Sequence, residues 1–252
     1  MRTSVYNTLL ALVFSLTASQ TLAALSVDRS RLIFNEGDKS VSMEITNNNK
    51  ELPYLAQGWL EDEHENKIKG KFTVLPPLQR IEPDSKTSIR LQALPDLSTL
   101  PQDRESLYYL NIREIPTKDN KENALTLALQ LRLKMFYRPS ALKITHVEGH
   151  YPGIEAVTLK KKDSGYTLVN PTPYYLTFTA IRDSQKGVAL PGFDPVMVSP
   201  KSTTELDLKG QFPHTSPVLM MIDDYGGTLR LTFRCSQTHC NAINVVSDLS
   251  IQ

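Results

Sequence analysis

Two cationic residues stand out because each lies in a segment with a β-strand pattern. Arg31 lies in the segment 28–34 (Asp-Arg-Ser-Arg-Leu-Ile-Phe), and Lys134 ends a run of alternating leucines. A charged side chain in a strand must point out of the sheet, and two neighbouring cations can hold a carboxylate by charge-assisted hydrogen bonds. The sequence alone leaves two interpretations open. The pair forms an anion site if the two segments lie side by side, and otherwise provides two separate surface charges.

The residue patterns of common enzymes are missing from the sequence. It contains no Gly-x-Ser-x-Gly, no His-Glu-x-x-His and no glycine loop for phosphate. Of the five histidines, His146 and His150 have a helical spacing, but Pro152 follows directly and favours a loop over a metal pair. The acidic residues at 61–65 predict a solvated hairpin rather than a pair of catalytic carboxylates. We therefore expect a protein that is not an enzyme.

The first 23 residues are typical of a secretory signal peptide. Arg2 precedes an apolar stretch at 8–16, and the small-residue pattern at 21–23 fits cleavage before Ala24. The stretch is too short to span a bilayer, and no later segment is long enough, so we expect an exported chain without membrane insertion. Cleavage would leave 252 − 23 = 229 residues with 27 basic and 27 acidic side chains, a balance that predicts no general affinity for nucleic acid.

The two cysteines, Cys235 and Cys240, favour a disulfide in an exported chain. His239 lies beside Cys240, but two thiols and one imidazole lack the fourth ligand of a structural zinc site. Closing so small a loop would stabilise the fold by about 2 kcal/mol in the chain-entropy model.

Short strand patterns separated by prolines and turn residues recur along the whole chain, and no segment has convincing helical periodicity. The fold class is therefore all-β. After Arg138-Pro139 the pattern restarts, which predicts two β-sandwich domains, at 24–143 and 144–252. The predicted strands are 41–46, 54–60, 88–92, 107–112 and the leucine run, then 156–160, 166–170, 175–180, 203–208, 218–222, 228–235 and 242–246.

The leucine run is the least ordinary of these segments. Five leucines occupy alternate positions from Leu125 to Leu133, within the twelve-residue run 123–134. As a strand this run would reach roughly 40 Å, about twice the usual strand length. Its apolar side chains need a partner, which is either a second sheet of the same chain or a groove in another protein. Lys134 has the opposite parity to the leucines and should emerge on the other face.

The run 100–116 (Leu-Pro-Gln-Asp-Arg-Glu-Ser-Leu-Tyr-Tyr-Leu-Asn-Ile-Arg-Glu-Ile-Pro) resembles the signature of periplasmic pilus-assembly chaperones of the chaperone–usher family. The segments 47–57, 136–139, 170–175 and 224–227 are also similar to this family, so the likeness covers nearly the whole mature chain. It implies two immunoglobulin-like domains at an angle with a cleft between them, no cofactor, and a location in the periplasm.

The resemblance also assigns roles to particular residues. Leu125, Leu127 and Leu129 match the donor residues that fill the groove of an incomplete pilus subunit. Leu131 and Leu133, the last two leucines of the run, would pack inside the chaperone's own first domain. Arg31 and Lys134 match the cleft cations that hold the subunit's C-terminal carboxylate. The partners implied are pilus subunits and the outer-membrane usher. Whether the free chaperone caps its own leucines by dimerising stays open.

Two further sets follow from the same resemblance. Glu105, Arg138 and Asp224 match a buried network of charges that joins the two domains. Cys235 and Cys240 match a disulfide that part of the family carries in the second domain.

One alternative of a different class remains, a secreted β-sandwich that is itself a fibre subunit or adhesin. Such a protein would need an N-terminal extension with alternating apolar residues, whereas this chain enters a predicted strand quickly, at 25–27. Stable polymers in gel filtration would favour this alternative.

Overall fold

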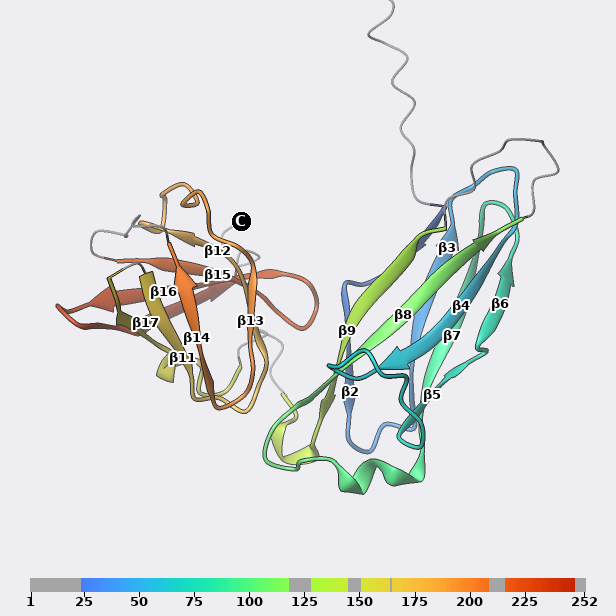
Figure 1. Cartoon of the computed structure of the whole chain (residues 1–252), viewed down its shortest axis with the longest axis horizontal. Coiled ribbons are helices and arrows are strands. Elements are labelled where there is room, and N and C mark those ends of the chain that lie inside the picture. The colour runs from blue at the N-terminus through green and yellow to red at the C-terminus, as the bar shows by residue number, and fades with distance from the viewer. Residues whose placement is uncertain (1–23, 118–127, 145–150, 164, 209–215, 248–252) are drawn as a thin grey trace, which may run out of the picture.

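Strands form nearly all the regular structure of the chain, arranged in two lobes (Figure 1). The computed structural model describes residues 24–117, 128–144, 151–163, 165–208 and 216–247. The predicted signal peptide (1–23), Leu125, Leu127, His146 and His150 lie outside the described residues. The described helical segments are 3-10 turns of three to five residues: η1 (Pro95–Thr99), η2 (Ser140–Leu142) and η3 (Ile154–Ala156).

The first lobe is a sandwich of two sheets. One sheet has the order β1-β3-β7-β5 and the other the order β2-β9-β8-β4-β6. The strands are β1 (Leu25–Val27), β2 (Arg31–Asn35), β3 (Ser40–Asn47), β4 (Tyr54–Glu61), β5 (Phe72–Leu75), β6 (Leu78–Ile81), β7 (Ser85–Ala93), β8 (Ser106–Pro116) and β9 (Gln130–Arg138). Alternate residues of both sheets, such as Ile45, Leu91, Leu110 and Met135, form one buried core.

The second lobe is one sheet of order β13-β12-β15-β16-β17-β10-β11-β14 that folds over on itself. Its strands are β10 (Thr158–Lys161), β11 (Gly165–Asn170), β12 (Leu176–Arg182), β13 (Val196–Val198), β14 (Ser202–Asp207), β15 (Val218–Ile222), β16 (Thr228–Cys235) and β17 (His239–Ser247). Because β17 pairs with both β16 and β10, the two halves face each other across a core that includes Leu168, Leu219 and Leu231. The second lobe is therefore a sandwich too.

Each sandwich contains a buried asparagine at the end of a strand, Asn47 in β3 and Asn170 in β11. The side-chain amide of Asn47 donates to the carbonyls of Leu52, Ile81 and Glu82 at 3.0, 3.2 and 3.1 Å. In the second lobe, Asn170 donates to three carbonyls in the same way. Buried carbonyls require such donors, so each asparagine ties a loop to the end of a neighbouring strand, at Ile81 of β6 and at Val198 of β13.

The all-β fold class and the two sandwiches confirm the prediction from the sequence. Strands β15 and β16 have the predicted bounds, whereas the short strands β5, β6 and β13 were not predicted. The boundary at 143 and 144 stays a prediction, because residues 145–150 lie outside the described ranges.

The structure describes the leucine run only from Ala128 onward, because residues 118–127 lie outside the described ranges. β9 begins at Gln130, so Ala128 and Leu129 lie outside it. The backbone N–H of Leu129 donates to the side chain of Glu114 at 3.3 Å, and the Leu129 carbonyl accepts from the Glu114 N–H at 2.9 Å. The other Glu114 carboxylate oxygen accepts from Leu25 N–H at 3.3 Å. The backbone bonding with β8 thus extends one residue beyond the start of β9, and the buried Glu114 side chain ties Leu129 to Leu25 of β1.

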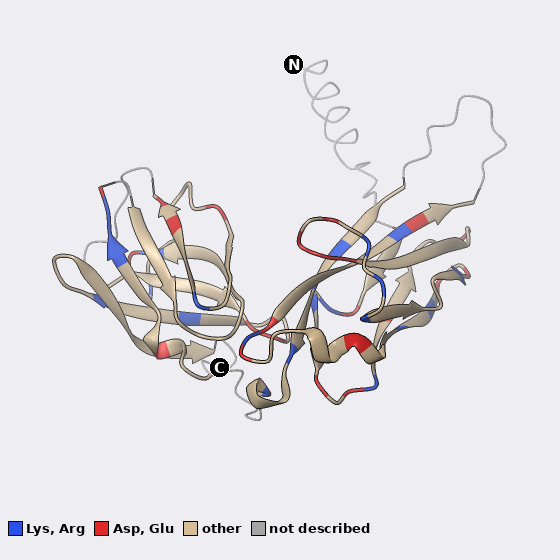
Figure 2. Ribbon diagram, turned by 60° about the horizontal axis from the view of Figure 1, so that its bottom comes forward, with Lys and Arg blue, Asp and Glu red and all other residues tan. Residues whose placement is uncertain are grey.

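Charged residues of both signs are distributed along the ribbon of both lobes in the described part of the chain (Figure 2). This distribution agrees with the net charge of +1. Among the described residues, no helix is long and apolar enough to cross a membrane.

Candidate functional site

Arg31 and Lys134 lie side by side on the outer face of the first lobe. β2 runs parallel to β9, and the register pairs Arg31 directly with Lys134. The side chains of both residues point away from the core of the first lobe and contact the second lobe. The structure therefore brings together the two cations whose adjacency the sequence left open.

The second lobe presents a matching pair of residues. Arg31 donates from a terminal guanidinium nitrogen (Nη1) to the carbonyl of Ile222 at 3.4 Å, and Lys134 Nζ lies 3.4 Å from Thr177 Oγ1. Thr177 and Ile222 are themselves register partners on β12 and β15. Two paired positions of one lobe thus face two paired positions of the other across the domain junction.

Both cations are held under conditions that disfavour their charge. Arg31 is only 7% exposed, and its Nε is buried without a hydrogen-bond partner among the described residues. Burial lowers the pKa of Arg31, and burial together with the positive charge of Arg31 lowers the pKa of Lys134. An anion placed between them would relieve the repulsion between the two positive charges.

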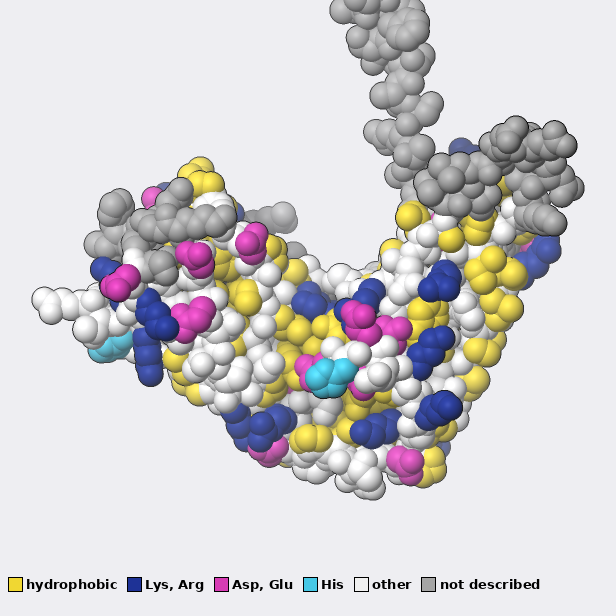
Figure 3. Space-filling view, in the orientation of Figure 1, with side chains coloured by type: hydrophobic (Ala, Val, Ile, Leu, Met, Phe, Trp, Pro, Cys, Tyr) yellow, Lys and Arg dark blue, Asp and Glu magenta, His cyan; other side chains and the backbone are white. Residues whose placement is uncertain are grey.

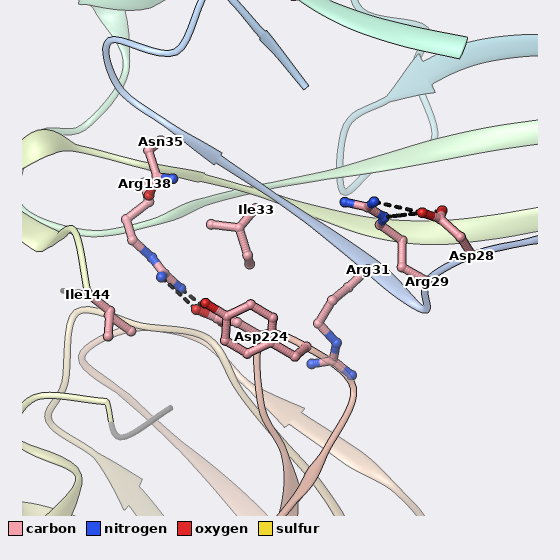
Figure 4. A pocket seen from close by; sticks show the side chains of 9 residues that line it. Asp28, Arg29, Arg31, Ile33, Asn35, Arg138, Ile144 and Asp224 are labelled. Atoms are coloured by element: carbon pink, nitrogen blue, oxygen red, sulfur yellow. Dashed lines mark hydrogen bonds and ion pairs between the residues drawn. The ribbon is translucent and has the colours of Figure 1, made fainter. Parts of the chain in front are cut away.

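The space beside Arg31 is hollow. A pocket of about 530 Å³ is lined by residues of both lobes, among them Arg29, Arg31, Asp224 and Tyr225. The space-filling view has a concave surface between the two lobes (Figure 3), and the close-up places Arg31 at one side of the pocket and the Arg138–Asp224 pair at another (Figure 4). A cationic group therefore borders an open interdomain cleft.

The predicted charged network is present at the base of the cleft. Arg138 lies between two carboxylates, at 2.7 Å from Glu105 and 2.7 Å from Asp224. The side chains of Arg138 and Glu105 are only 3% and 1% exposed. Tyr151 donates its hydroxyl to Asp224 at 2.8 Å, and the Tyr175 N–H donates to Glu105 at 2.8 Å. Because Glu105 and Arg138 belong to the first lobe and Asp224 to the second, the network joins the lobes.

Sequence reasoning missed a second junction around Tyr175. Its ring packs against Phe136 of β9 with centroids 5.5 Å apart, and the two are part of an apolar cluster with Leu107. The Tyr175 hydroxyl donates to Glu63 at 3.2 Å. Glu63 belongs to the acidic hairpin at 61–65, which the sequence predicts to be merely solvated. This contact depends on how the two lobes pack together, which no local sequence pattern specifies.

The described leucines of the run differ in exposure along the strand. Leu129 is 48% exposed, Leu131 packs partly against the core, and Leu133 is buried. β9 pairs with β8 from Gln130 to Tyr137, but with β2 only from Lys134 to Arg138. One edge of β9 therefore has no partner strand in the described structure from Gln130 to Leu133.

The cysteines lie away from the cleft, at the turn between β16 and β17. Cys235 and Cys240 are register partners and form a disulfide, as the sequence predicts. Among the described residues, no group of three or more His, Cys, Asp and Glu side chains could hold a metal ion.

Two sandwich domains with a cationic cleft and a half-paired strand at its rim define a class of two-domain immunoglobulin-like proteins. The family model for the PapD N-terminal domain of pili and flagellar-assembly chaperones matches residues 24–143, and the model for the PapD C-terminal domain of pili-assembly chaperones matches residues 153–233. The chain therefore belongs to the family of PapD-like pilus-assembly chaperones, which are not enzymes and act in the periplasm.

Individual relatives agree with this assignment. The chain is 44% identical over 231 residues to the probable fimbrial chaperone YfcS of Escherichia coli K12, covering 92% of this chain and 90% of that protein. It is 43% identical over 220 residues to the chaperone protein PapD of Escherichia coli, covering 87% and 90%. The crystal structure of the periplasmic chaperone SfaE has a TM-score of 0.62 and 29% identity, covering 81% of this chain and 95% of that one.

Proposed function

We propose that the protein is a periplasmic chaperone that completes the fold of pilus subunits by donating a strand, and that it delivers them to an outer-membrane usher. The observation that carries the proposal is the unpaired edge of β9 between Gln130 and Leu133, which begins where Arg31 and Lys134 stand. An added strand would satisfy the free backbone groups of this edge, as in other cases of β-strand addition, of which chaperone–pilin complexes are a known example.

The same geometry favours a direction for the guest strand. A chain whose terminal carboxylate is held by Arg31 and Lys134 would extend back along β9 toward Leu129, and so would run parallel to β9. It would take the line of β2, which is itself parallel to β9 and starts at Arg31. The guest strand would thus continue an edge that the chaperone leaves incomplete.

The apolar side chains would supply the affinity. Leu129 is strongly exposed, as expected of a residue that is buried only in a complex. Burial of Leu125, Leu127 and Leu129 in a subunit groove would contribute roughly 5 to 8 kcal/mol before ordering costs, at about 1.5 to 3 kcal/mol for each side chain. Residues 1–23 would act as the cleaved signal that brings the chain to the periplasm.

The test is co-expression of the protein with a pilus subunit and recovery of the complex from the periplasm. Leu129→Glu and Lys134→Ala should each lower the yield of complex by tenfold or more, which is about 1.4 kcal/mol or more of binding free energy. Leu52→Glu is a matched control, because Leu52 is 47% exposed on the same lobe but lies outside the proposed edge. Undiminished recovery with Lys134→Ala would refute the anchor, and undiminished recovery with Leu129→Glu would refute strand donation.

A further inference from the structure

Tyr225 is an unusually exposed aromatic residue at the mouth of the cleft. Its side chain is 83% exposed, although a tyrosine ring normally gains from partial burial. It lines the same pocket as Arg29 and Arg31. We propose that Tyr225 is a third binding residue of the cleft, whose ring packs on the last residue of the bound subunit beside the carboxylate. This inference rests on the proposed function and adds a contact that would recognise the side chain of the subunit's last residue.

The turn that carries Tyr225 is held firmly in place. Buried Asp223 accepts hydrogen bonds from the N–H of Tyr225 at 2.9 Å and of Gly227 at 2.7 Å, and its own N–H donates to the Gly227 carbonyl at 2.9 Å. Such a capped turn costs little ordering entropy when a ligand binds. The ring of Tyr225 is therefore presented on a rigid support.

The turn is also fixed against the first lobe. Gly226 has a φ of +86°, and a Cβ at this position would lie 3.2 Å from Ser30 Oγ. A glycine is needed here for both its left-handed conformation and its close approach to Ser30. Asp224, which precedes Tyr225, is bound to Arg138 in the interdomain network. The position of Tyr225 is thus tied to the geometry of the cleft itself.

The path of the guest strand leads to this ring. Residues 28–30 connect β1 in one sheet to β2 in the other. They therefore lie at the end of the free edge of β9 that the guest strand would occupy. A guest strand that ends at Arg31 must place its last residue near this crossing. Arg29 from the crossing and Tyr225 from the second lobe line one pocket there. The last side chain of the guest would fill that pocket against the aromatic ring.

The experiment measures binding of a fluorescent peptide of about ten residues, the length of a long strand, with alternating valine and threonine and a final phenylalanine with a free carboxylate. Tyr225→Ala should weaken binding by about tenfold, or about 1.4 kcal/mol, whereas Tyr225→Phe should stay within about twofold. Val188→Ala is the control, because Val188 is 80% exposed on the same lobe and is not among the residues lining the cleft pocket.

Other outcomes separate this inference from the proposed function. A second peptide, with a C-terminal amide in place of the carboxylate, is measured in parallel. The role of Tyr225 is refuted, and the carboxylate site stands, if Tyr225→Ala binds the first peptide as tightly as the parent does while Arg31→Ala binds it more weakly and the parent binds the amide more weakly. An equal loss in Tyr225→Phe would also overturn the packing role, because the hydroxyl would then be the binding group. If neither Arg31→Ala nor the amide weakens binding, the carboxylate site fails and the inference fails with it.

Discussion

Replacing Arg138 with methionine should be among the most damaging single changes at the domain junction. Arg138 is the cation between Glu105 and Asp224, and its loss leaves Glu105 buried with only the N–H of Tyr175 as a partner. Asp224 is less affected, because its side chain is 15% exposed and keeps the Tyr151 hydroxyl. Removing one partner from a buried ion pair costs about 3 to 5 kcal/mol, and we expect a loss of this size above neutral pH, where Glu105 of the parent is ionised.

The loss should depend on pH in a defined direction. Burial raises the pKa of Glu105 from 4.5 to about 7, against the lowering effect of Arg138. The folded state therefore binds this proton more tightly, so the stability that Glu105 contributes is fully present below pH 4.5 and is lost as the pH rises through 7. Without Arg138 the pKa of Glu105 should rise further. The cost of Arg138→Met should consequently grow as the pH rises above 7, by about 1.4 kcal/mol for each unit of that additional rise, and should change little on acidification below 7.

Urea unfolding at several pH values measures both effects. The fluorescence of Trp59, the single tryptophan, reports the first lobe, and far-ultraviolet circular dichroism reports both lobes. The control is the double variant Glu105→Gln/Arg138→Met, which removes the uncompensated charge and should recover most of the stability. The reasoning is refuted if Arg138→Met unfolds at the parent's urea concentration at about pH 9, or if its cost is the same at about pH 9 as at about pH 6.

Three further changes test other parts of the structure. Asn170→Ala should lower the free energy of unfolding, measured in urea, by about 2 to 4 kcal/mol, because three carbonyls lose their shared buried donor. Asn66→Ala, at an exposed position, should lower it little, and equal losses for the two variants would contradict this account. Cys235→Ser should lower the unfolding free energy by about 2 kcal/mol, and reduction with dithiothreitol should then have no additional effect. Tyr175→Phe should cost about 1 kcal/mol by removing the hydrogen bond to Glu63 while keeping the ring on Phe136, and Glu63→Gln combined with it should add almost nothing in a double-mutant cycle.

The sequence predicts well whatever depends on local alternation. A strand turns successive side chains to opposite faces, so the parity of Leu131, Leu133 and Lys134 predicts which of them enter the core. The structure agrees, with Leu133 buried in the core and Lys134 on the opposite face beside Arg31. The same rule identified most strands of both sandwiches without any knowledge of their partners, and missed the short strands β5, β6 and β13.

What the sequence could not predict depends on pairings between distant residues. Arg31 and Lys134 are 134 − 31 = 103 positions apart, and a slip of one residue in the parallel register of β2 and β9 would place one of them in the core. No local pattern specifies that register. The acidic hairpin is a similar case, because the bond from Tyr175 to Glu63 exists only once the two lobes have docked.

The cleft cations connect these long-range pairings to function. In the free protein, placing Arg31 and Lys134 side by side in a partly buried site has a cost, which is why burial and mutual repulsion lower the pKa of Lys134. Selection for stability alone would favour apolar side chains at these two positions. On the proposed function, a carboxylate that enters the cleft would offset this cost, and the relief would contribute to its binding free energy. The cost of the site in the free state and the proposed affinity for a chain end would then have the same physical cause.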